Sequence, residues 1–152
     1  MKAEYINPFL ESAIIVIEQV AQVKPAPGKP GLKQFTLVEN YIFIQIGIHG
    51  QVSGNIIFGI SEQVAVKIVS AMMGGFTIAA IDEIGRSAIS ELGNMISGNA
   101  STLLYNQGVH VDITPPIVVN SPDVSLEMAK TLTIPLIMEG LGELDIQFLI
   151  AS

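Results

Sequence analysis

Apolar positions along the chain predict three helices. They recur every three or four residues over about residues 4–23, from Ser61 to the glycine pair Gly74-Gly75, and over about residues 81–106. This spacing is typical of amphipathic helices that bury one face. Ser61 is expected to cap the second helix, and the two glycines are expected to end it.

Two other segments are rich in β-branched residues around a short glycine-containing connection, at about Tyr41–Ile60 and Thr131–Ile150. This pattern predicts two β-hairpins. Ile46–Ser61 and Leu136–Ala151 also superpose at an offset of 90 residues, which aligns Gly50 with Gly140, Ile56 with Ile146, Phe58 with Phe148 and Ile60 with Ile150. Either the chain consists of two pseudo-symmetric halves, or two amphipathic hairpins are alike by chance.

The predicted order is helix, hairpin, helix, helix, hairpin, with a proline-containing extended link after the first and the last helix. Strands that come in antiparallel pairs indicate an α+β fold, and not a doubly wound parallel sheet. A length of 152 residues fits a single domain, residues 1–152, with a full core.

Composition narrows the classes of function. Hydrophobic residues make up 49% of the chain and charged residues 14%, so we expect a homodimer to cover the apolar excess. A net charge of −7 argues against nucleic-acid binding, which needs clustered cations. The absence of cysteine excludes disulfides and thiolate sites. Because no uncharged apolar run approaches the roughly 20 residues of a membrane helix, we expect a cytoplasmic protein without a membrane span.

The predicted long helix carries two distinct faces. At about 100° per residue, one arc is apolar and is predicted to face the core: Ile81, Ile84, Ala88, Leu92, Met95, Ile96 and Leu103. A second stripe contains Ser87, Glu91, Asn94 and Gly98, flanked by Ser90, Ser97 and Ser101. Solvated helix faces usually carry long charged residues, whereas small residues allow another surface to approach. The pattern alone leaves open a docking face, a solvated face, or internal packing of Gly93 and Gly98.

The spacing Ser-x-x-x-Glu-x-x-Asn formed by Ser87, Glu91 and Asn94, followed by Pro115 and Pro116, resembles the signature of the CheC/CheX chemotaxis phosphatases. The surrounding SAISELGNMISGNAS is similar to the CheX branch of that family in particular. The resemblance implies a CheC/CheX-like α/β sandwich of two pseudo-symmetric helix–hairpin halves. The family proline falls one position after Pro116, which leaves the register of the following strand open.

The resemblance also implies a function: hydrolysis of the aspartyl phosphate of a CheY-like response regulator in chemotaxis signalling. Asn94 would position the attacking water, and Glu91 would pair with the active-site lysine of the regulator. Ser87, Ser90 and Gly98 would let the two proteins approach closely. No cofactor is expected on this chain, because the regulator would supply Mg²⁺. The alternative is a non-catalytic regulator-binding or flagellar-switch-like module of the same fold.

Other residue types that could carry chemistry are few. His49 and His110 lie far apart in the sequence without recognisable partners, so neither is expected to hold a metal or to activate a nucleophile. Glu139, Glu143 and Asp145 surround a predicted turn without the spacing of a calcium loop, and we expect a solvated loop.

Overall fold

The computed structural model describes residues 3–119 and 130–151 and contains the three predicted helices. They are α1 (Ala3–Ala21), α2 (Glu62–Met72) and α3 (Glu83–Asn106). Ser61 caps α2 as predicted, because its hydroxyl accepts a hydrogen bond from the Val64 amide at 3.2 Å. Asp82 caps α3, where its carboxylate accepts from the Gly85 amide at 2.9 Å.

The described strands form one antiparallel sheet. Its long strands are those of the two predicted hairpins, β3 (Tyr41–Gly50) with β4 (Ser53–Ser61) and β7 (Lys130–Met138) with β8 (Gly142–Ala151). The sheet order is β1-β7-β8-β4-β3-β5, with β2 also paired to β7 and β6 also paired to β3. The short edge strands are β1 (Ala26–Pro27), β2 (Gly31–Gln34), β5 (Val111–Ile113) and β6 (Ile117–Val118).

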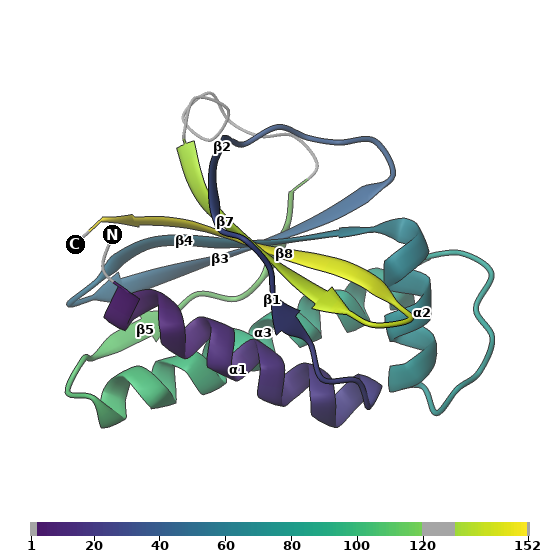
Figure 1. Cartoon of the computed structure of the whole chain (residues 1–152), viewed down its shortest axis with the longest axis horizontal. Coiled ribbons are helices and arrows are strands. Elements are labelled where there is room, and N and C mark those ends of the chain that lie inside the picture. The colour runs from purple at the N-terminus through teal and green to yellow at the C-terminus, as the bar shows by residue number, and fades with distance from the viewer. Residues whose placement is uncertain (1–2, 120–129, 152) are drawn as a thin grey trace.

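The helices lie on one face of this sheet, with α1 and α3 side by side (Figure 1). Residues at alternate strand positions point to the same face, and here the even-numbered positions face the helices. They build the main core together with Phe9, Ile17 and Leu92 from the helices, and they include Ile42, Ile44, Ile46, Ile48, Ile56, Phe58, Ile60, Ile134, Leu136, Met138, Leu144, Ile146 and Phe148. On the opposite face, Phe35, Phe43 and Ile57 form a second, smaller cluster.

The sheet confirms the internal repeat. The two hairpins meet through β4 and β8, where Ile57 lies opposite Gln147, its own equivalent at the offset of 90 residues. A pair of equivalent residues that face each other marks the pseudo-two-fold axis. The extended link after α1 pairs with β7, and the link after α3 pairs with β3, so the edges are equivalent too. Chance similarity would produce neither relation.

The link after α3 resolves the register that the sequence left open. Ile113 pairs with Ile48 and Val118 pairs with Ile44, so the link holds one residue more than β3 between these two pairs. Thr114 bridges the irregularity: its amide donates to the Gly47 carbonyl at 2.9 Å, and its hydroxyl accepts from the Gly47 amide at 2.8 Å. The bulge places Pro116 at the sheet edge, where it lies near residues of α3.

Candidate functional site

The buried face of α3 differs from the predicted arc. Leu92 and Ile96 are buried as predicted, and Ile81, just before the helix, is 9% exposed, but Ile84 is 64% exposed. Ala88, Met95 and Leu103 are only partly buried. The side that packs consists of Gly85, Ile89, Leu92, Gly93, Ile96, Ser97, Ala100 and Leu104. The prediction followed residue hydrophobicity, whereas the contact requires small residues because the helix lies close to the sheet and to α1.

Two small residues of α3 show how close this packing is. A Cβ atom on Gly93 would lie 3.3 Å from the Phe58 ring and 3.5 Å from Ile44, so Gly93 serves helix–sheet packing. Ser97, predicted to flank the polar stripe, is instead fully buried, and its hydroxyl has no hydrogen-bond partner within the described residues. Gly98 differs from both, because apart from its chain neighbours and the nearby backbone of α3, no atom of the described residues lies within 4 Å of the position of its Cβ.

Glu91 and Asn94 lie on the side of α3 that faces away from the core. Glu91 is exposed and Asn94 is partly buried. Residues three apart on a helix have Cβ atoms about 5–6 Å apart, so the carboxylate and the carboxamide are neighbours. Neither side chain has a hydrogen bond or an ion pair to residues 3–119 or 130–151. Both groups are therefore available to a second protein.

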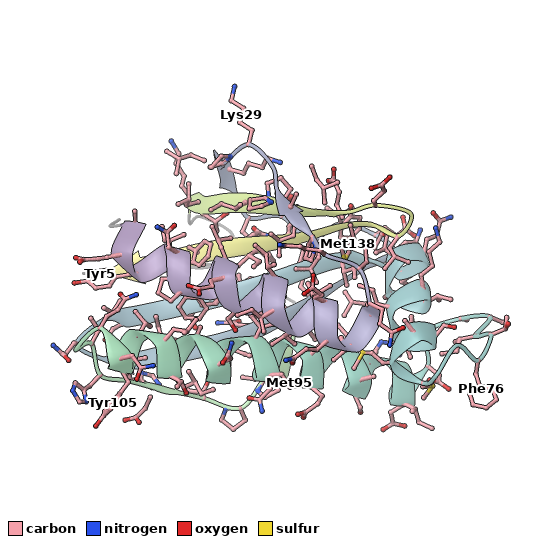
Figure 2. The ribbon with its side chains drawn as sticks, turned by 60° about the horizontal axis from the view of Figure 1, so that its bottom comes forward. Tyr5, Lys29, Phe76, Met95, Tyr105 and Met138 are labelled. Carbon is pink, nitrogen blue, oxygen red and sulfur yellow. The ribbon has the colours of Figure 1, made fainter. Side chains whose placement is uncertain are left out.

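The other predicted stripe residues surround this pair. Ser87 is exposed, and Ser90, Gly98 and Ser101 are partly buried. The Ser101 hydroxyl donates to the Gly98 carbonyl at 2.8 Å, so its hydrogen is already used within the helix. Figure 2 shows the course of α3 at the side of the molecule opposite the sheet, with Met95 midway along it and Tyr105 near its end. The stripe is a ridge of small residues from which Glu91 and Asn94 project.

A groove of about 540 Å³ runs between this ridge and the sheet edge. Its lining residues are Glu83, Arg86, Ser87, Ser90 and Glu91 of α3, with Pro116 and Val118 from the link that follows. The sequence indicated Ser87, Ser90 and Glu91, but it did not indicate the place of Glu83, Arg86, Pro116 or Val118. Arg86 could have been noticed, because it is the only basic residue in α3.

The remaining candidates do not form a second site in the described part of the chain. Asp112 lies opposite His49 on adjacent strands, while His110 contacts Tyr105 with ring centroids 4.6 Å apart. Within residues 3–119 and 130–151, no three His, Asp or Glu side chains are grouped to hold a metal. Asp145 was expected in a solvated loop, but it lies within β8 on the outer face of the sheet. Burial there raises the pKa of its carboxyl, although Lys33 opposes the rise.

Comparison with known proteins decides the family. The family model for the chemotaxis phosphatase CheX matches residues 42–140. The CheY-P phosphatase CheX of Thermotoga maritima is 35% identical over 153 residues, which cover 100% of this chain and 99% of that protein. The chain belongs to the CheX family. The resemblance carried by Ser87, Glu91, Asn94 and the following prolines is thereby confirmed at the level of the family.

Solved structures support the same fold. A CheC-like superfamily protein from Shewanella sp. PV-4 superposes with a TM-score of 0.84 at 28% identity, covering 100% of both chains. A chain in the crystal structure of the CheX–CheY–BeF₃–Mg²⁺ complex from Borrelia burgdorferi superposes with a TM-score of 0.79 at 26% identity, covering 97% of this chain and 98% of that one. The predicted α+β sandwich of the CheC/CheX type is confirmed. None of the helices in the described ranges is long and apolar enough to cross a membrane.

Proposed function

We propose that this CheX-family chain hydrolyses the aspartyl phosphate of a CheY-like response regulator, and that Glu91 and Asn94 enter the active site of the regulator. The observation that carries the proposal is the placement of these two side chains next to each other, unpaired within the described residues, on the outer ridge of α3. The T. maritima relative is a CheY-P phosphatase, and the Borrelia complex joins a CheX to a CheY.

Asn94 positions the attacking water. Phosphoryl transfer needs a nucleophile in line with phosphorus and little covalent chemistry from the protein. Holding a water in that position therefore supplies most of the rate acceleration. A carboxamide can both accept from and donate to that water, and it brings no negative charge next to the phosphoryl group. A carboxylate at position 94 would repel the phosphoryl oxygens.

Glu91 holds the regulator in register. Its carboxylate forms a charge-assisted hydrogen bond with the active-site lysine of the regulator, which fixes the distance at which Asn94 enters. Glu91 is exposed and free of partners within the described residues, so making this contact breaks no internal bond. The open space over Gly98 and the short side chains of Ser87 and Ser90 let the regulator lie close against α3.

The metal belongs to the regulator in this mechanism. BeF₃⁻ stands in for the phosphoryl group in the Borrelia complex, which also contains Mg²⁺ and CheY. Mg²⁺ offsets the charge of the phosphoryl oxygens while it is bound to carboxylates of the regulator. In this mechanism the residues of this chain do not coordinate the metal. They orient the attacking water and the active-site lysine of the regulator.

A phosphate-release assay tests the proposal, with Asn94→Ala compared to wild type and Asn99→Ala as a control of the same residue type in α3. At saturating phosphorylated regulator, Asn94→Ala is expected to lose about 100-fold in kcat, because a displaced nucleophile costs about that factor. Asn99→Ala should stay within about twofold of wild type. Equal rates for Asn94→Ala and wild type would mean that the chain is a regulator-binding module without this mechanism.

We also propose that the chain acts as a homodimer, as its apolar excess suggests. The short strands β1, β2, β5 and β6 leave sheet edges at which a second copy could extend the sheet. Sedimentation velocity at micromolar concentration should give the mass of two chains. A single-chain mass at all concentrations up to about 100 µM, where a specific interface should already be populated, would refute the dimer.

A further inference from the structure

The first turn of α3 carries two side chains that the catalytic proposal does not use. Ile84 is 64% exposed, although its residue type predicts burial, and it packs against neither described core cluster. Arg86 is exposed, lines the groove, and has no ion-pair partner within the described ranges. An isolated exposed isoleucine is ordinary, so the significance of this one depends on its position.

Ile84 lies on the same ridge as the proposed catalytic pair. It precedes Glu91 by seven residues, which places it two helical turns away, about 10 Å along the axis and within about 20° around it. A regulator that covers Glu91 and Asn94 over an interface of ordinary size also covers a side chain at that distance. Ile84 would then pass from water into the contact, which is favourable for an apolar group.

Arg86 supplies a positive charge on a part of the surface where the other charged residues are acidic. The chain has a net charge of −7, and Glu83 and Glu91 line the same groove. The phosphorylation cleft of a regulator that binds Mg²⁺ is itself acidic, so two negative surfaces must meet. Arginine pairs with carboxylates through two parallel hydrogen bonds, and it speeds the encounter of oppositely charged surfaces. No other base lies in α3.

We propose that Ile84 and Arg86 form a second contact region for the phosphorylated regulator, which sets affinity and choice of regulator without taking part in hydrolysis. Ile84 contacts an apolar patch next to the phosphorylation cleft, and Arg86 pairs with a carboxylate at its rim. This inference rests on the proposed function for the identity of the partner. The docking surface would therefore extend along α3 from Gly98, past the Glu91–Asn94 pair, to the first turn of the helix.

The test measures binding separately from hydrolysis. The dissociation constant of the BeF₃⁻-activated, Mg²⁺-loaded CheY-like regulator is determined by calorimetry for Ile84→Ser and Arg86→Glu. Both substitutions are tolerable in the first turn of a helix, and Glu near an N-terminus suits the helix dipole. The matched controls are Ile15→Ser, an isoleucine of α1 that is 39% exposed, and Lys67→Glu in α2.

Each variant is expected to raise Kd about tenfold, as loss of an interface contact of about 1.4 kcal/mol does. The salt dependence of Kd should weaken in Arg86→Glu and persist in Ile84→Ser. The kcat at saturating phosphorylated regulator should stay within about twofold of wild type, and the controls should bind like wild type.

Unchanged Kd values in both variants would overturn this inference and leave the proposed function intact. A wild-type chain that binds the activated regulator without hydrolysing its phosphate would defeat the proposed function, while the Kd comparison would still decide the role of Ile84 and Arg86. If Ile84→Ser converts a dimer to a monomer by sedimentation and leaves Kd unchanged, Ile84 belongs to an interface between copies and the inference is wrong.

Discussion

Gly98 offers a direct test of whether the α3 ridge is a docking surface. Glycine in a helix interior costs about 1 kcal/mol relative to alanine. Among the residues that the structure describes, none outside the adjoining turns of α3 lies within 4 Å of the Cβ that an alanine would add at position 98. Gly98→Ala should therefore stabilise the protein by about 1 kcal/mol and raise Tm by about 2–4 °C, the shift typical of a domain of this size. A close approach by a partner would account for a glycine that costs stability at this position.

Gly93→Ala is the matched control, because the gain in helix propensity is the same. The new Cβ would lie 3.3 Å from the ring of Phe58, which is 2% exposed and cannot move aside freely. Overpacking of this kind costs about 1–3 kcal/mol and offsets the gain. Urea unfolding followed by circular dichroism should rank the proteins as Gly98→Ala above wild type, with Gly93→Ala at or below it.

The functional part of this prediction uses a larger side chain. Gly98→Gln introduces a good helix former and fills the open space over the ridge. It should therefore fold normally and raise Kd for the BeF₃⁻-activated regulator about tenfold, which corresponds to about 1.4 kcal/mol. Wild-type affinity in Gly98→Gln would refute the close approach. If Gly98→Ala is less stable than wild type, the space around position 98 is not open and this reasoning is wrong.

Four other substitutions test the packing and the electrostatics. The hydroxyl of Ser12 donates to the Ile96 carbonyl at 2.6 Å, whereas the equally buried Ser97 hydroxyl lacks a described partner, so Ser12→Ala should lose about 1 kcal/mol and Ser97→Ala should be neutral or stabilising in urea unfolding. Asp82→Ala removes the cap of α3 and should cost about 1 kcal/mol in the same measurement, with no change in the ridge. Burial raises the pKa of the Asp145 carboxyl, so this group binds its proton more tightly in the folded protein than in the unfolded chain. At a pH above the folded pKa the carboxyl is ionised, and its burial then lowers the stability of the fold. Asp145→Asn should therefore be more stable than wild type at pH 7, and its advantage should shrink as the pH falls toward the ordinary value of 3.8; an advantage that grows on acidification would contradict this.

The sequence predicted the elements well because their signals are local. Both hairpins were placed within about a residue, since the β-branched runs and turn glycines act over short distances. The repeat offset of 90 residues was also predicted, and the structure adds that the equivalent residues Ile57 and Gln147 face each other across β4 and β8. The hairpin registers differ all the same: Ile46 pairs with Ile56, but the equivalent Leu136 pairs with Leu144. A shift of two residues leaves each side chain on its face, so the pattern could not reveal it.

The site was only partly predictable, because burial depends on what packs against a helix. Ile84 was assigned to the core and Ser97 to the surface on residue type, and both assignments were wrong. The close contact of α3 with the sheet favours small side chains, and Ile84 is exposed because it lies two turns before Glu91 on the outer face of the helix. The groove also needed Pro116, which a bulge brings beside α3 from a separate segment. Glu91 and Asn94 were singled out by their resemblance to the CheC/CheX signature, and their spacing of three places them on one face of the helix.

A crystal structure of this chain with its BeF₃⁻-activated, Mg²⁺-loaded regulator would show whether the Glu91–Asn94 pair enters the active site of the regulator. We expect a water about 3 Å from the Asn94 carboxamide and in line with beryllium, and a carboxylate oxygen of Glu91 about 3 Å from the regulator lysine. A complex in which the outer ridge of α3 faces away from the regulator, or in which Asn94 contacts no water in the cleft, would contradict this expectation.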